Sequence, residues 1–162
     1  MDAEKCACSH LEVVIAMSRN LDNELCPACK AFVSTMAGKP LNKMSDILAC
    51  LEHFRDKKQE YFICLSVDGS QRLIARRIVT IGLLDSTLVH PREVFAGPLE
   101  DRAASVIIAH NHPSGEAAPS REDIKTTQQL VAAGILLGVP LRDHLIVTRT
   151  EHYSFKEHHL IM

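Results

Sequence analysis

A nearly unbroken apolar run, Tyr-Phe-Ile-Cys-Leu-Ser-Val at residues 61–67, constrains the fold more than any other segment of this chain. A run of this length without polar alternation is typical of a central strand in a sheet that is covered on both faces. The Asp68-Gly69 pair that follows is typical of a hairpin turn. Further strands are predicted at residues 73–81, 105–109, 140–148 and 153–155.

Three helices are predicted to accompany these strands. Ser45 is expected to cap the first, whose apolar residues recur at helical spacing as far as Phe54. The second is expected to span residues 91–95, with a proline in its first turn. It should end there because Gly97-Pro98 would interrupt a longer helix.

The third predicted helix opens at Ser120 and reaches about Ala133. Its apolar stripe is predicted to consist of Ile124, Thr127, Val131 and Ile135. Helices mixed with strands, in a sheet that starts with an antiparallel pair, indicate an α/β or α+β sandwich.

Length and charge restrict the function. A chain of 162 residues points to one domain with a short appendage at most, and 46% hydrophobic residues can build a core. No apolar run is long enough to cross a membrane and no signal-peptide core is present, so a cytoplasmic protein is expected. A net charge of −2 and 4% aromatic residues disfavour nucleic acid as the main partner. The oligomeric state stays open.

The N-terminal part of the chain differs from the rest and ends at a Gly-Lys-Pro break. We therefore divide the chain into a Cys-containing helical segment at residues 1–40 and a domain at residues 41–162. The segment carries four cysteines with the spacing C-x-C-x17-C-x2-C, namely Cys6, Cys8, Cys26 and Cys29. These thiolates can close a structural zinc site, with His10 as a fifth candidate ligand, or they are ordinary reduced thiols.

The chemistry of the chain is concentrated in residues 109–123, where a predicted strand ends in His-Asn-His-Pro and a loop leads to a predicted helix. His110 and His112 are two residues apart, so both imidazoles should project from one face of the strand. This spacing suits two ligands of a single metal ion. The loop delivers Ser120 and Asp123 to the first turn of the following helix.

Two imidazoles and one carboxylate leave zinc a fourth position for water, which is the pattern of a catalytic site. Hydrolysis then needs a base for the water's proton, and Ser120 can donate a hydrogen bond to the oxyanion. The alternative is structural, because Ser120 and Asp123 can form a helix capping box. Since both roles need the Asp123 carboxylate, metal binding and capping are expected to exclude one another.

The segments His-Asn-His-Pro-Ser-Gly at 110–115 and Pro-Ser-Arg-Glu-Asp at 119–123 resemble the JAMM signature of the JAB/MPN metalloprotease superfamily, and most closely the RadC family. The resemblance covers roughly residues 41–160 and includes three further segments, at residues 89–95, 143–147 and 153–155. It implies an MPN/JAB-like mixed sheet flanked by helices, in a cytidine-deaminase-like sandwich.

The resemblance also implies roles for single residues. His110, His112 and Asp123 match the zinc ligands of the signature, and Ser120 matches the residue that assists the oxyanion. Glu60, directly before the apolar run, matches the position of the general base. An acid at such a junction is more often merely solvated.

Other residues are weaker candidates. Glu52 and Glu93 are alternative bases. His90 is expected either to line the cleft or to act structurally at a helix start. Asp143 and His144 are expected either to orient a metal ligand from behind or to complete a hydrogen-bonded strand end.

The resemblance implies a zinc-dependent JAMM-type hydrolase that cleaves amide or isopeptide bonds of a peptide or protein substrate. The alternative is a RadC-type protein of DNA repair or recombination without hydrolytic activity. Net charge and the lack of a recognisable helix-hairpin-helix region oppose this alternative. A non-catalytic scaffold is opposed by the filled ligand positions. The donor set can also hold divalent ions other than zinc.

Overall fold

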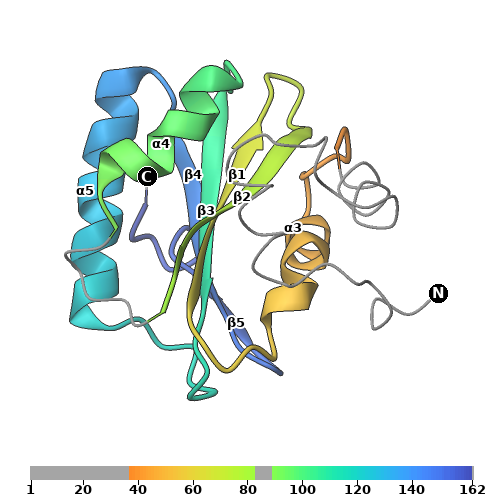
Figure 1. The fold of residues 1–162 in the computed structure, drawn as a ribbon, viewed down its shortest axis with the longest axis vertical. Helices are drawn as coiled ribbons and strands as arrows, with labels where there is room; N and C mark the ends of the chain where they lie inside the picture. Colours follow the sequence, from red (N-terminus) through yellow and green to blue (C-terminus); the bar gives the residue numbers. More distant parts are fainter. Residues whose placement is uncertain (1–36, 83–88, 162) are drawn as a thin grey trace.

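The computed structural model describes residues 37–82 and 89–161 and contains a five-stranded mixed sheet with helices on both faces (Figure 1). The elements, in chain order, are α3 (Met44–Leu51) with a 3-10 turn (Glu52–Phe54), β1 (Tyr61–Val67), β2 (Leu73–Ile81), α4 (Pro91–Glu100), β3 (Ser105–Asn111), α5 (Arg121–Leu137), β4 (Leu141–Val147) and β5 (His152–Ser154). The α/β sandwich predicted from the sequence is confirmed.

The sheet has the order β2-β1-β3-β4-β5. β1 pairs antiparallel with β2 and β3, whereas β3 and β4 are parallel. Parallel neighbours need a crossover connection, and α5 supplies it. The C-terminal end of β3 and the start of α5 therefore lie at the same end of the strands.

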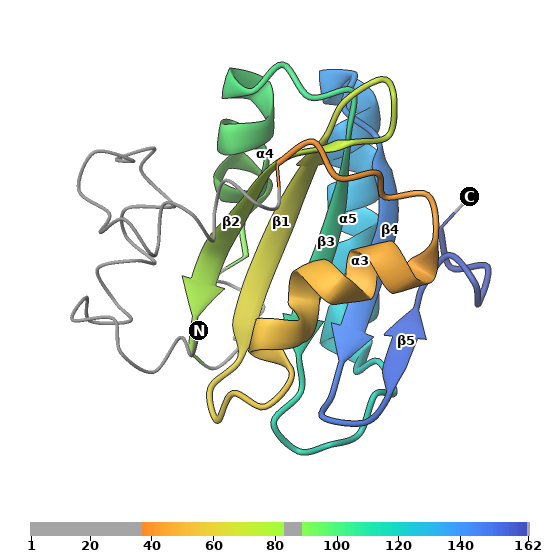
Figure 2. The same ribbon diagram turned by 90° about the vertical axis from the view of Figure 1, so that its right-hand side faces the viewer.

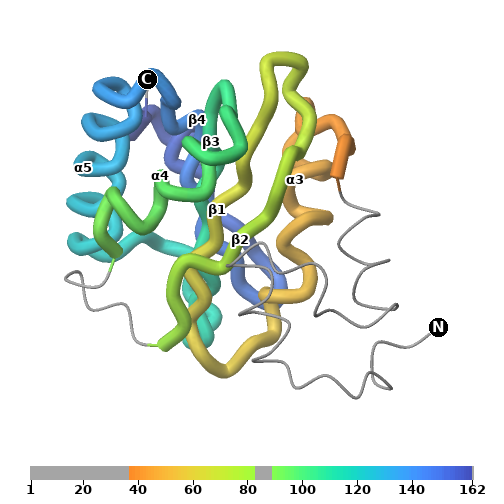
Figure 3. Tube along the Cα trace, turned by 45° about the horizontal axis from the view of Figure 1, so that its top comes forward, coloured from red at the N-terminus to blue at the C-terminus, as the bar shows by residue number. Residues whose placement is uncertain are grey.

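The two faces of the sheet bury separate apolar clusters, because successive side chains of a strand point to opposite sides. Ile63 and Leu65 of β1 belong to the cluster under α3, whereas Phe62 and Cys64 belong to the cluster under α4 and α5. Figures 2 and 3 show α3 on one face of the sheet and α4 and α5 on the other. All residues of β1 and β3 are buried, as expected for central strands.

The first helix begins at Met44, one residue before the predicted cap, so the prediction for Ser45 is wrong. Lys43 occupies the N-cap position, and its backbone N–H donates to Oδ2 of Asp46 at 3.0 Å. An acidic side chain three residues into the helix thus satisfies the end of the helix in place of a serine hydroxyl.

The second helix, α4, continues through Gly97-Pro98 to Glu100, so the predicted interruption is also wrong. Pro98 removes one backbone donor but lies buried among the apolar residues of the helix. Gly97 leaves room for Arg77, because a Cβ at this position would lie 2.6 Å from Cδ of Arg77. Arg77 in turn binds Asp101 just beyond the helix, with Nη2 2.7 Å from Oδ1. This contact with the sheet favours the longer helix.

The third helix, α5, extends to Leu137 and ends at Gly138, whose φ of 70° is the left-handed conformation that suits glycine. Ile135 is 68% exposed, so the predicted apolar stripe is wrong at its end. The buried residues of α5 are Asp123, Thr126, Thr127, Leu130 and Gly134. Thr127 belongs to the predicted stripe, whereas the buried Asp123 and Thr126 are polar residues outside it.

The predictions for residues 1–40 fall almost entirely outside the described part of the chain. The N-terminal helices, the four-cysteine zinc site with His10 and the domain boundary therefore stay predictions. Within residues 37–82 and 89–161, none of the helices is both long and apolar enough to span a bilayer.

Candidate metal centre

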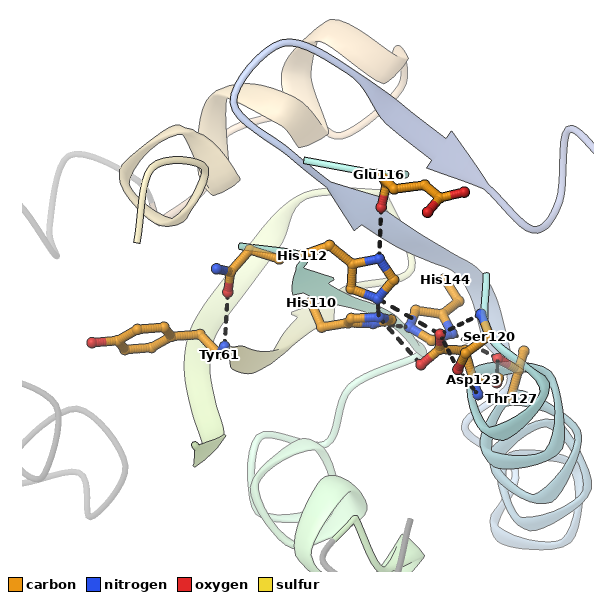
Figure 4. Close-up of polar contacts among 9 residues, drawn as sticks. Tyr61, His110, His112, Glu116, Ser120, Asp123, Thr127 and His144 are labelled. Atoms are coloured by element: carbon orange, nitrogen blue, oxygen red, sulfur yellow. Dashed lines mark hydrogen bonds and ion pairs between the residues drawn. The ribbon is translucent and has the colours of Figure 1, made fainter. Parts of the chain in front are cut away.

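His110, His112 and Asp123 form a cluster beside the C-terminal end of the central strand β3, where α5 begins (Figure 4). One ligand atom from each residue lies within 4.8 Å of the others. His110 is in β3, His112 is the first residue after that strand, and Asp123 is in the first turn of α5. The structure thus brings together the three residues that the signature matches as metal ligands.

The histidines are held by the sheet. His110 pairs in register with Phe62 of β1 and Ile146 of β4. The backbone N–H of His112 donates to the carbonyl of Val147 at 3.0 Å, which continues the pairing beyond the end of β3. The His110 ring is fully buried and lies parallel to the Phe62 ring, with centroids 6.1 Å apart. The imidazole positions are therefore fixed by rigid strands.

The loop after β3 fixes the second imidazole. The chain turns at Gly115, which has a φ of 87° and donates its N–H to the carbonyl of His112 at 3.1 Å. This turn places the carbonyl of Glu116 2.8 Å from Nδ1 of His112. A carbonyl can only accept, so Nδ1 of His112 donates and Nε2 faces the cluster.

Asp123 divides its carboxylate between the helix start and the cluster. Oδ2 accepts the Ser120 backbone N–H at 2.7 Å and the Ser120 hydroxyl at 2.6 Å. Oδ1 lies 3.3 Å from Nε2 of His110. Capping thus uses Oδ2 and leaves Oδ1 on the side of the imidazoles, so this geometry does not support the expectation that capping and metal binding exclude one another.

The protonation states suit a cation. Burial lowers the pKa of His110 to about 4 and favours its neutral form. Burial alone would raise the pKa of Asp123, but the hydrogen bond with His112, the nearby His110 ring and the hydrogen bonds from Ser120 outweigh it and hold that pKa well below its usual range. For His112, the hydrogen bond to Asp123 raises the pKa more than burial lowers it. The centre thus combines an ionised carboxylate with a neutral imidazole.

This donor set fits a divalent metal ion. Two imidazole nitrogens and one carboxylate oxygen are common zinc ligands, and sites with three protein ligands leave one position open. Iron and other first-row divalent ions also accept two histidines and a carboxylate. The chemistry of the cluster therefore supports metal binding without selecting the metal.

The cluster lies in a cleft that also holds Glu60. The cleft is lined by Glu60, Phe62, Val89, His112, Ser120, Glu122, Asp123, Thr126 and His144. The charge of Glu60 is among the causes that raise the pKa of His112, after the hydrogen bond to Asp123. The structure therefore brings the Glu60 carboxylate to the same cleft as the metal ligands.

Asn111 is a buried residue that sequence reasoning missed. Its Oδ1 accepts the backbone N–H of Tyr61 at 2.7 Å, and its Nδ2 donates to the carbonyl of Gln59 at 2.9 Å. The side chain therefore holds the backbone on both sides of Glu60. A buried amide at a strand end needs such partners, but the sequence does not say where they are.

The alternative bases lie elsewhere. Glu52 and Glu93 are exposed, and neither lines the cleft. Glu52 lies 3.6 Å from Arg55, and Glu93 lies 3.0 Å from Arg92.

The weaker candidates separate into two groups. His90 is the exposed N-cap of α4, where Nδ1 accepts the Arg92 N–H at 3.2 Å. Asp143 accepts hydrogen bonds from the Ser154 hydroxyl at 2.6 Å and the Lys156 N–H at 3.0 Å, so it ties β4 to the segment after β5. These two residues have structural contacts. His144, in contrast, touches a candidate ligand, with Nε2 2.9 Å from Nδ1 of His110.

A mixed α/β sandwich with a His-His-Asp cluster between a strand end and a helix start defines a JAB-type domain. The chain belongs to the RadC-like JAB domain family, which matches residues 41–160. The resemblance found in the sequence is therefore confirmed.

Several curated relatives, each called UPF0758 protein, are similar to this chain. One from Protochlamydia amoebophila is 43% identical over 111 residues, which are 68% of this chain and 48% of the relative. One from Methanospirillum hungatei is 53% identical over 100 residues, 62% of this chain and 44% of the relative. One from Clostridium perfringens is 41% identical over 135 residues, 82% of this chain and 60% of the relative. The chain spans about half the length of these relatives.

Proposed function

We propose that this chain is a divalent-metal-dependent hydrolase of the JAMM type that cleaves an amide or isopeptide bond in a peptide or protein. The observation that carries this proposal is the cleft in which a candidate ligand cluster and a separate carboxylate, Glu60, lie together. Metal-assisted hydrolysis needs both features.

His110, His112 and Asp123 would hold the metal, with zinc as the first choice. A bound divalent ion would polarise the scissile carbonyl and lower the pKa of a coordinated water. The neutral state of His110 and the ionised state of Asp123 support binding, because metal ligands must be deprotonated.

Glu60 acts as the general base in this proposal. Its carboxylate accepts a proton from the attacking water while the new C–O bond forms, and it passes that proton to the leaving nitrogen as the C–N bond breaks. Asn111 and the bond from the Gly82 N–H to the Glu60 carbonyl, at 2.9 Å, hold the backbone that carries this group. The base is thus presented from an ordered strand start.

Ser120 assists the oxyanion in this proposal. Its hydroxyl now donates to Oδ2 of Asp123 at 2.6 Å. Rotation of the hydroxyl toward the cleft would supply a donor to the developing negative charge. The Ser120 backbone N–H would keep its own bond to Asp123 and so preserve the helix cap.

The first test separates metal binding from proton transfer. We expect Glu60→Gln to keep the metal and to lose cleavage by about 10²–10⁴-fold, which is the usual contribution of a general base. His112→Ala should lose the metal as well as cleavage. Metal content is measured by plasma mass spectrometry, and cleavage by mass spectrometry on a library of peptides with lysine-linked peptide branches.

An unchanged cleavage rate in Glu60→Gln would reject this residue as the base. Equal metal content in the wild type and His112→Ala would reject the metal centre. Glu93→Gln is the matched control, because this exposed acid lies outside the cleft and its loss should alter neither measurement.

A further inference from the structure

We infer that Thr127 and His144 form a hydrogen-bond relay that holds His110 in the one tautomer able to bind a metal through Nε2. The inference rests on the proposed metal centre and names two positioning residues behind it. Neither residue belongs to the candidate ligand cluster.

The relay starts at Thr127, in the second turn of α5. Its Oγ1 lies 2.6 Å from the backbone carbonyl oxygen of Asp123. Two oxygens this close need a hydrogen between them, and a carbonyl has none, so the Thr127 hydroxyl donates there. A hydroxyl has a single hydrogen, and Thr127 can therefore only accept from its other neighbour.

That neighbour is Nδ1 of His144, 2.6 Å from Oγ1 of Thr127. Nδ1 must supply the hydrogen of this contact. The His144 ring is fully buried between Phe62 and Phe155, and its two nitrogens contact a hydroxyl and an imidazole, so the ring is neutral and carries one hydrogen only. Nε2 of His144 is therefore an acceptor.

Nε2 of His144 lies 2.9 Å from Nδ1 of His110. Since the former accepts, the latter donates, and a His110 ring with its one hydrogen on Nδ1 keeps a lone pair on Nε2. This is the atom that faces His112 and Asp123 in Figure 4. The direction of one threonine hydroxyl thus decides which nitrogen of His110 is available to a metal.

The relay has little freedom to rearrange. The His144 ring is fully buried and stacks on Phe155, with centroids 4.6 Å apart and planes 14° apart. Phe62 packs on it as well, at 5.8 Å. Aromatic packing therefore fixes the ring plane while the hydrogen bonds fix its tautomer.

His112 also carries a hydrogen on Nδ1, but its partner there is not part of the relay. Nδ1 of His112 donates to the carbonyl of Glu116, so Nε2 of His112 also directs a lone pair inward when the ring is neutral. The two Nε2 atoms are 2.9 Å apart. Facing lone pairs repel unless a cation or a proton is shared between them, so the arrangement is set in advance for a positive ion.

The test compares Thr127→Val, which has nearly the same shape but no hydroxyl, with Thr127→Ser, which keeps the hydroxyl. Without the hydroxyl, His144 can carry its hydrogen on Nε2, and His110 must then move its own hydrogen to Nε2. We expect Thr127→Val to weaken Zn²⁺ binding by about 10–100-fold, the usual cost of losing a group behind a ligand. Thr127→Ser should restore binding to within about threefold of the wild type.

Zn²⁺ affinity is measured by competition with a chromophoric chelator, and the His110 tautomer by long-range ¹H–¹⁵N NMR of the metal-free protein. The wild type should show the hydrogen on Nδ1. His144→Phe, which keeps the aromatic packing, should weaken binding like Thr127→Val, and the double variant should lose no more than His144→Phe alone. Circular dichroism checks that each variant is folded.

Wild-type Zn²⁺ affinity in a folded Thr127→Val protein would overturn the relay. A His110 hydrogen on Nε2 in the metal-free wild type would overturn it as well. These outcomes differ from failure of the proposed function, because the tautomer is read without metal or substrate. A wild type that binds no Zn²⁺ would refute zinc as the metal of the proposed hydrolase and leave the NMR experiment to decide the relay.

Discussion

Asn111 shows how much one side chain between two candidate metal ligands contributes. It is fully buried, and its amide spans from Tyr61 to Gln59 across the strand junction that carries Glu60. Removing such a side chain leaves the buried N–H of Tyr61 without this partner, which costs about 1–3 kcal/mol, whereas the carbonyl of the exposed Gln59 can turn to water.

We therefore predict that Asn111→Ala lowers the free energy of unfolding by about 1–3 kcal/mol, the cost of one unpaired buried group. Urea denaturation followed by circular dichroism measures the change. The control is Asn42→Ala at an exposed asparagine, which should lie within about 0.5 kcal/mol of the wild type. An Asn111→Ala protein as stable as this control would show that the amide does not hold the junction.

Residue spacing predicted part of the candidate site. Two histidines at strand spacing and an acid at a helix start could be recognised as one group, and the resemblance added Glu60. Asn111 and Thr127 could not be recognised, because their importance depends on partners 50 and 17 residues away in the chain. A buried polar contact of this kind has no periodic signal.

At the scale of elements, strands were predicted better than helices. The bounds of β1 and β2 agree with the prediction, because an apolar run and a hairpin turn are local signals. The course of α4 depends on Arg77, a residue of β2 that packs against Gly97. Such a contact between distant segments overrides the local helix-breaking tendency of proline.

The Arg77–Asp101 pair at the end of α4 makes the stability of the fold depend on pH. Burial alone would raise the pKa of Asp101, but the hydrogen bond and the charge of Arg77 outweigh it and lower that pKa. A carboxylate whose pKa is lower in the folded state stabilises the fold above its unfolded pKa, near 3.8. That stability is lost as the pH falls through the folded pKa.

We predict that Asp101→Asn costs about 3 kcal/mol at pH 7, because it leaves a largely buried arginine without its oppositely charged partner. The difference from the wild type should shrink at low pH, once the wild-type carboxylate is protonated. Urea unfolding at several pH values tests this, with the exposed Asp56→Asn as control. A difference that stays constant down to low pH would contradict the assigned role of the charge.

At the scale of the whole molecule, the candidate metal centre joins two layers of the sandwich. His110 and His112 come from the sheet layer, and Asp123 comes from the helical layer. The general architecture could be predicted because the motif resemblance covers most of the chain and the family match confirms it. The role of the first part of the chain, including its four cysteines, stays a prediction.

A ligand that binds only the folded state stabilises it by mass action. We predict that zinc at about 100 times its dissociation constant raises the free energy of unfolding by about 2.7 kcal/mol, and that a chelator abolishes the gain. Thermal unfolding with and without chelator measures the effect. His112→Ala should show no response, and a response as large as that of the wild type would place the stabilising metal elsewhere.

The two oxygens of Asp123 have a consequence for how metal occupancy and helix dynamics are linked. One oxygen closes the first turn of α5, and the other faces the imidazoles. The first turn therefore cannot fray without withdrawing a ligand from the centre. By thermodynamic reciprocity, an ion bound to that ligand must suppress the fraying of the turn to the same degree.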